Sequence, residues 1–233
     1  MRASRISGLV FLLAAAGLLA FFTALRLELI ASRYNPLLTL DLTDPPGLMS
    51  EVKLWLIEGN RPACIAAFAR ANVVVTAMPH RTAKPGCGRE GTVLVRTLSE
   101  ADIGGEEMRC DVAMRLYLLE RHIIQPLARR HLGAGVDRIT HFGSYSCRTM
   151  RGSSWRMSEH STANAFDISG FRTANGRMIS LKKDWPTGGA PARFLRDVRR
   201  GACSLFNMVL SPDYNADHAD HFHVDQGLFR GCH

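Results

Sequence analysis

Two short stretches near the C-terminus have the residue types and spacing of a metal site. His160 and Asp167 form an H-x6-D pair, and residues 218–223 read H-x2-H-x-H. Two imidazoles and one carboxylate, with a fourth position left for water, are the ligand count of a catalytic rather than a structural zinc site. Zinc lowers the pKa of a water that it binds, which suits amide hydrolysis at neutral pH. The pattern therefore predicts a hydrolytic zinc centre.

Strand geometry predicts how the histidine and aspartate side chains of the two stretches can come together. Alternate side chains of a strand share a face, so His221 and His223 point the same way in the strand expected at 221–225, and Asp220 points the other way. Asp167 lies on the polar face of a second expected strand and can meet a histidine from a neighbouring strand. Spacing alone does not fix which of the histidines are ligands.

The surrounding segments alternate between helical and strand patterns. An amphipathic helix is expected over 111–132, where Pro126 should kink or divide it. The other expected elements are a helix at 61–71, strands at 73–75, 92–95, 137–146 and 163–171, a hairpin partner at 177–181 after an Asn-Gly turn, a helix at 191–210 and the strand at 221–225. This order predicts an α+β fold, a small antiparallel sheet packed by helices.

The N-terminus carries an uncharged apolar run, Gly8–Leu25, preceded by Arg2 and Arg5. At 1.5 Å per residue the run is about 27 Å long, enough to cross the hydrocarbon core of a bilayer. Its length favours an uncleaved transmembrane anchor, with a cleaved signal peptide as the alternative. Either reading sends the remaining chain outside the cytoplasm. The expected organisation is a membrane segment at 1–30, a proline-containing linker at 31–48 and one domain at 49–233.

Cysteine usage and charge agree with export. The number of cysteines is even and the sequence has no C-x-x-C motif, which predicts up to three disulfides of undetermined pairing. Cys64 and Cys87 could form one that stabilises the first lobe of the domain. The net charge of +8 suits an anionic partner such as lipid headgroups or a wall polymer. The basic residues are scattered and no helix-turn-helix pattern occurs, so nucleic acid is not an expected partner.

The motif S-x-H-x6-D, followed by H-x2-H-x-H, resembles the zinc D-alanyl-D-alanine peptidases of the M15 family and the wider group that includes lysostaphin-type enzymes. The resemblance implies a fold of that type and a zinc ion held by His160, Asp167 and His223. It places His221 beside the water on the metal and His218 further out. The run Ser144–Arg148 supplies Arg148 as a substrate contact. Ala163 stands where the M15 pattern usually has glycine.

A closer resemblance is to bacterial extensin-like C-terminal domain proteins, over about residues 50–232. It rests on GSYSCR, SEHSTANAFDISGF, FLRDVRRGACSLF and SPDYNADHADHFHVD. These observations favour a membrane-anchored, zinc-dependent peptidase or amidase that acts on peptidoglycan peptides. We expect a single-pass inner-membrane protein with its domain in the periplasm; secretion to the periplasm after signal cleavage is the alternative. The rival function is an inactive envelope module that binds wall polymer and keeps a vestigial or structural metal site.

Overall fold

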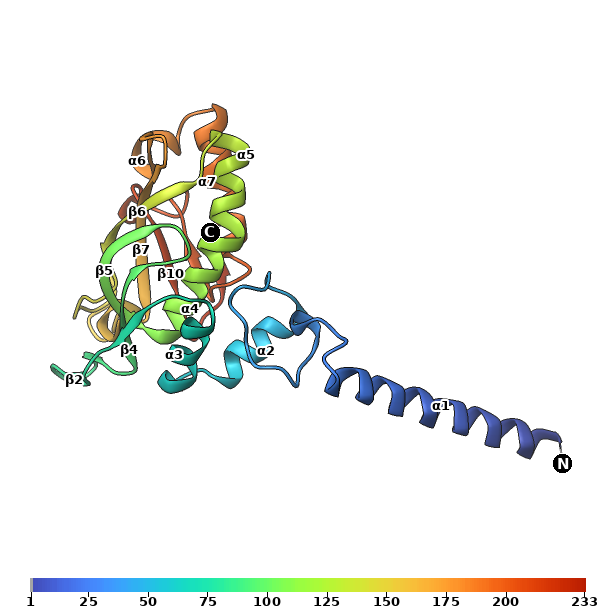
Figure 1. Ribbon diagram of the computed structural model, residues 1–233. Coiled ribbons are helices and arrows are strands. Elements are labelled where there is room, and N and C mark those ends of the chain that lie inside the picture. Colours follow the sequence, from blue (N-terminus) through green and yellow to red (C-terminus); the bar gives the residue numbers. More distant parts are fainter. Residues whose placement is uncertain (1) are drawn as a thin grey trace.

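The computed structural model describes residues 2–233, so Met1, the first residue of the expected membrane segment, lies outside the described part (Figure 1). The N-terminal helix α1 (Arg2–Arg26) projects away from the rest of the chain. Its segment Gly8–Arg26 has a mean hydropathy of 2.4 and is almost entirely exposed. Among the described residues it is the one helix long and apolar enough to cross a membrane, although a signal sequence has the same properties.

The domain is α+β, as predicted, but its sheet is larger than expected and mixed rather than antiparallel. Two neighbouring pairs, β5 with β6 and β9 with β11, are parallel. The order across the sheet is β1 (Val75–Ala77), β4 (Thr92–Thr97), β5 (Asp102–Arg109), β6 (Val136–Gly143), β7 (Ala165–Thr173), β10 (Phe222–Asp225), β9 (Met208–Leu210) and β11 (Gly231–Cys232), with β8 (Met178–Ser180) also on β7. The strands β2 (Arg81–Thr82) and β3 (Gly88–Arg89) form a separate hairpin.

Strands β5 and β6 are parallel because a helical rod connects them. A crossover of this kind brings the chain back in the same direction. The rod consists of α4 (Cys110–Leu119), a π-helical turn η2 (Glu120–Ile124) and α5 (Gln125–Leu132). The π turn ends at Ile124, two residues before Pro126. Proline has no N–H to donate and its ring crowds the preceding turn, so a wider turn accommodates it without ending the rod.

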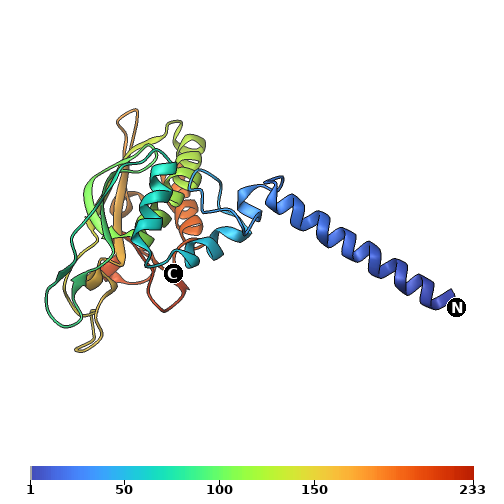
Figure 2. The same cartoon turned by 60° about the horizontal axis from the view of Figure 1, so that its bottom comes forward.

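Helices cover one face of the sheet, and α7 (Gly189–Ala202) packs beside α5 (Figures 1 and 2). The prediction of one helix over 191–210 is wrong in its second half, because Met208–Leu210 forms β9 against β10. The turn before β9 begins at Cys203, which is bonded to Cys232. Pairing with β10 overrides the local helical pattern of this segment. The core holds, among others, Phe166, Ile168, Phe171, Phe194, Val198, Leu116 and Phe222.

The segment between α1 and the sheet is folded against the domain. It contains the 3-10 turn η1 (Ser32–Tyr34) and the helices α2 (Leu48–Leu56) and α3 (Arg61–Arg70). Leu40 and Leu42, from the stretch expected to be a linker, are buried in the hydrophobic core. The short helix α6 (Leu181–Asp184) follows β8.

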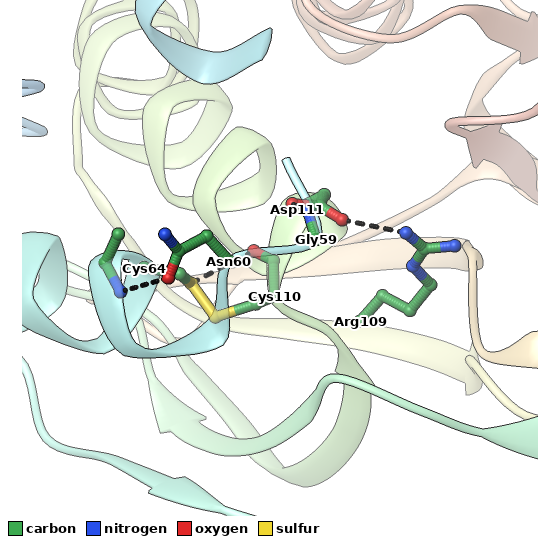
Figure 3. Close-up of a disulfide and its surroundings, with 7 residues drawn as sticks. Gly59, Asn60, Cys64, Arg109, Cys110 and Asp111 are labelled. Atoms are coloured by element: carbon green, nitrogen blue, oxygen red, sulfur yellow. Dashed lines mark hydrogen bonds and ion pairs between the residues drawn. A yellow bond between two sulfur atoms is a disulfide. The ribbon is translucent and has the colours of Figure 1, made fainter. Parts of the chain in front are cut away.

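The prediction of three disulfides is confirmed, with the pairs Cys64–Cys110, Cys87–Cys147 and Cys203–Cys232. Cys64 and Cys87 are therefore not bonded to each other; each joins the first lobe to a later part of the domain. Figure 3 shows the first pair, which fastens α3 to the start of α4. Beside it, Asn60 caps α3 by accepting a hydrogen bond from the backbone N–H of Ala63. Such a set of disulfides is typical of proteins that fold in an oxidising compartment.

Candidate metal centre

The pairing of β7 with β10 brings the two halves of the sequence motif together. In this antiparallel pair, Asp167 stands directly opposite His223. His160 comes from the 3-10 turn η3 (Glu159–Thr162), which precedes β7 and begins where the Ser158 hydroxyl accepts a hydrogen bond from the His160 N–H. All three chemical groups are buried. The structure thus brings His223 to His160 and Asp167, which lie more than fifty residues before it in the sequence.

Three atoms converge at the centre of this cluster. Nε2 of His160 lies 3.2 Å from Nδ1 of His223. Oδ1 of Asp167 lies 3.1 Å from that nitrogen of His160 and 3.0 Å from that nitrogen of His223. Two ligands of a tetrahedral zinc ion, each bound at about 2.0–2.1 Å, are separated by about 3.3 Å. The three spacings are close to that value, so the donor set fits a zinc ion.

Hydrogen bonds to the outer ring nitrogens fix which nitrogen of each histidine faces the centre. Nδ1 of His160 donates to the backbone carbonyl of Ser144 at 2.8 Å, and Nε2 of His223 donates to the carboxylate of Asp225 at 2.8 Å. The inward nitrogens therefore present lone pairs in the neutral imidazoles. Two such lone pairs and a carboxylate oxygen facing one another form a donor set that could hold a cation.

The electrostatics of the cluster also favour positive charge at its centre. Burial lowers the pKa of His223, but hydrogen bonds to Asp167 and Asp225 outweigh it and raise the pKa to about 9. Burial raises the pKa of Asp167, but hydrogen bonds with His160 and His223 outweigh it and hold the pKa of this carboxyl well below its usual range. The protein surroundings therefore favour one positive charge at the centre, which a proton or a metal ion can supply.

Two further histidines lie beside the cluster. Nε2 of His221 is 3.7 Å from Oδ1 of Asp167, and the edge of the Phe142 ring packs against the His221 imidazole. The His218 ring lies 5.1 Å from the His221 ring and 5.9 Å from the His223 ring, centroid to centroid. Burial, followed by the nearby histidines His221 and His223, lowers the pKa of His218 to about 4. His218 is therefore a neutral imidazole at pH 7.

Asp220 does not point away from His221, contrary to the strand-based expectation. Its Oδ1 accepts a hydrogen bond from Nδ1 of His221 at 2.9 Å. The reason is that β10 begins at Phe222, so residues 220 and 221 lie in the preceding turn, where strand alternation does not apply. This bond leaves Nε2 of His221, the nitrogen nearest to Asp167, as the one able to accept a proton.

Arg148 lies on the loop after β6 and its side chain is exposed. Its backbone carbonyl accepts a hydrogen bond from the N–H of Ser158, at the start of the turn that carries His160. Within the described part of the chain its guanidinium forms no hydrogen bond or ion pair with the protein. The neighbouring Cys147 is held to the β2–β3 hairpin by its disulfide with Cys87. The backbone at Arg148 is thus fixed, and the guanidinium is free to bind a ligand.

Sequence reasoning missed the groups that orient the cluster. Asp225 is two residues after His223 in β10, so strand alternation, which places both side chains on one face, could have identified it. Ser144 contributes a backbone carbonyl, for which no sequence signal exists. Glu159 adjoins His160 in sequence, and its carboxylate accepts a hydrogen bond from the side-chain amide of Asn164 at 2.7 Å.

The model of the family described as "Extensin-like protein C-terminus" matches residues 62–233, most of the chain. The matched part contains every residue of the centre described above. Searches of curated proteins and of solved structures found no match. The chain therefore belongs to the extensin-like C-terminal family.

Proposed function

We propose that this member of the extensin-like C-terminal family is a membrane-anchored, zinc-dependent peptidase or amidase that acts on peptidoglycan peptides in the periplasm. The proposal takes the M15-type motif resemblance as a guide to chemistry, together with the geometry of the chain's own residues. The apolar helix α1 and the three disulfides support an anchored protein whose domain folds outside the cytoplasm.

One observation carries the proposal: the inward atoms of His160, Asp167 and His223 converge at 3.0–3.2 Å. The outer nitrogens of the two histidines are already hydrogen-bonded. These three side chains would hold the zinc ion. Outer hydrogen bonds of this kind orient metal-binding histidines, and the two bonds to Ser144 and Asp225 have that form. A zinc ion bound there supplies Lewis acidity, which polarises a carbonyl and makes water more acidic.

The remaining side chains have distinct parts in the hydrolysis of an amide. His221, oriented by Asp220, presents Nε2 toward the cluster and accepts the proton of the attacking water. The same nitrogen can then return that proton to the leaving amine. His218 is uncharged beside it and can share a hydrogen bond with the reacting groups. Arg148 offers a planar guanidinium to a carboxylate of a wall stem peptide.

The direct test uses the full chain, purified in detergent and incubated with peptidoglycan fragments. We expect release of D-alanine or cleavage of cross-linked peptides, loss of this activity with a chelator and recovery when zinc is added back. The variant His223→Ala should lose both zinc and activity, whereas the matched variant His80→Ala, on the exposed β2–β3 side of the domain, should keep both. Equal activity in the two variants would overturn the assignment.

The same preparation also distinguishes the enzyme from the rival function, an inactive envelope module that binds wall polymer. A module of that kind would sediment with intact peptidoglycan whether or not chelator is present, and it would release no peptide. The net charge of +8 is the observation that favours it. The convergent ligand atoms with His221 beside them favour the enzyme, because a binding surface needs neither.

A further inference from the structure

Helix α2 has an apolar face that the protein leaves open. Its inner side, which includes Lys53 and Leu54, is buried. On the outer side, Leu48, Val52 and Trp55 follow at spacings of four and three residues and so share one face. Leu48 is 75% exposed and Trp55 is 68% exposed. Contiguous apolar faces of this kind on a folded protein mark an interaction site.

This face lies at the end of the apolar helix α1. The buried side chain of Asn35 donates a hydrogen bond to the backbone carbonyl of Leu25, in the last turn of α1, at 2.8 Å. The ammonium of Lys53, on the buried side of α2, donates to the backbone carbonyl of Ser32 at 2.6 Å. Figures 1 and 2 both show α2 in the region between α1 and the sheet. These bonds hold α2 against the turn that follows α1.

More exposed apolar side chains occupy the connection between α1 and α2. We call these side chains, together with those of α2, the juxtamembrane apolar surface. Its members are Leu27, Leu29, Tyr34, Leu37, Leu48, Val52, Trp55 and Leu56. The surface is thus continuous along the chain with the apolar helix α1.

We propose that the juxtamembrane apolar surface rests on the lipid bilayer and fixes the orientation of the catalytic domain relative to the membrane. The inference rests on α1 being a retained membrane span, as in the proposed function. If α1 crosses the bilayer, α2 must lie close to the interface. The hydrogen bonds of Asn35 and Lys53 hold α2 and the turn before it at the end of α1. Tryptophan and tyrosine favour that interface, and amphipathic helices bury their apolar face in it. Trp55 and Tyr34 fit this environment.

The experiment places the full chain in phosphatidylcholine vesicles whose acyl chains carry bromine, a short-range quencher of tryptophan fluorescence. The chain has three tryptophans, and α1 contains none of them. We expect the bromine to quench the wild type and the variant Trp155→Phe, and the variant Trp55→Phe to lose that quenching. Trp155 is the matched control because it is also highly exposed but lies on the loop before η3.

The outcomes separate this inference from the proposed function. A protein that floats with vesicles but shows no quenching dependent on Trp55 overturns the docking and leaves the anchor intact. A protein that does not float removes the anchor, and the docking with it, while zinc-dependent hydrolysis can still be measured. A third outcome is a dimer in detergent that the variant Trp55→Ser dissociates, together with no quenching by the brominated lipid. This result would assign the surface to a second copy of the chain and overturn the proposal.

Discussion

The carboxylate of Asp225 accepts a hydrogen bond from Nε2 of His223 at 2.8 Å, through the ring nitrogen that does not face Asp167. Its other oxygen accepts from the backbone N–H of Gly227 at 2.8 Å. Asp225 is therefore itself held in place while it fixes the tautomer and the direction of the His223 ring. This relationship makes Asp225 a positioning residue for the proposed metal centre.

Replacing Asp225 by asparagine should weaken zinc binding about 10–100-fold, the usual effect of losing an outer carboxylate partner. The amide is similar in shape but lacks the charge that makes the His223 imidazole a stronger ligand. Zinc affinity can be measured by competition with a chromophoric chelator at fixed pH. The control is Asp137→Asn, which breaks a surface ion pair with Arg172 and should leave zinc affinity unchanged. Wild-type affinity in the Asp225 variant would remove this residue from the centre.

His221 should matter for turnover but not for metal content. The variant His221→Gln keeps a polar side chain next to Asp220 but cannot accept a proton as imidazole does, so hydrolysis should slow about 10²–10⁴-fold. Zinc content, measured by mass spectrometry of the metal on the same sample, should equal that of the wild type. Unchanged turnover would exclude His221 as the base, and loss of zinc would make it a ligand instead.

Ala163 joins η3 to β7 with a φ of 55°, in the left-handed region, and it is completely buried. A residue with a Cβ atom is strained there by about 1–2 kcal/mol, whereas glycine is not. The variant Ala163→Gly should therefore raise the free energy of unfolding by up to about 1 kcal/mol, after the greater freedom of glycine in the unfolded chain is subtracted.

The matched control for Ala163 is Ala165→Gly, two residues later in β7, where glycine gains nothing and weakens the strand. Both variants add the same freedom to the unfolded chain, so the difference between them reports the native backbone alone. Thermal unfolding in detergent, followed by circular dichroism, measures both. Two variants destabilised equally would show that the left-handed conformation of Ala163 carries no strain.

The elements near the centre follow closely from the sequence pattern. The strand expected at 163–171 corresponds to β7, and the Asn-Gly turn leads to β8 as predicted, with Gly176 at a φ of 85°. The alternation of apolar and polar residue types indicates these strands locally, although β7 is buried along most of its length. It also predicts that Asp167 lies on a polar face, where the structure indeed brings it together with His223.

What the sequence could not predict depends on contacts between distant segments. β5 contains two adjacent glycines, Gly104 and Gly105, and acidic side chains, so it lacks the apolar alternation of a strand. It becomes one because β4 and β6 offer it backbone partners on both sides. Likewise, the orientation of His160 depends on the carbonyl of Ser144, which only the folded chain brings within 2.8 Å.

The pair of helices α5 and α7 should make stability depend on pH through Asp197. This carboxylate accepts hydrogen bonds from His131 of α5, at 2.8 Å, and from Arg200 of its own helix. Burial raises the pKa of Asp197, but the bonds from Arg200 and His131 outweigh it and lower the pKa below the ordinary value. The folded state then binds this proton less readily than the unfolded state. Its contribution to stability is therefore present above the unfolded pKa of about 4 and is lost as the pH falls through the lower folded pKa.

The variant Asp197→Asn should accordingly lower the free energy of unfolding by about 1 kcal/mol at neutral pH, the usual net value of a partly buried hydrogen bond. The deficit should shrink as the pH falls below about 4, first because the unfolded wild type gains the proton and then because folded Asp197 gains it at lower pH. Chemical unfolding at a series of pH values measures this difference directly. A deficit that stayed constant down to the lowest pH would mean that Asp197 acts through packing of α7 on α5 and not through its charge.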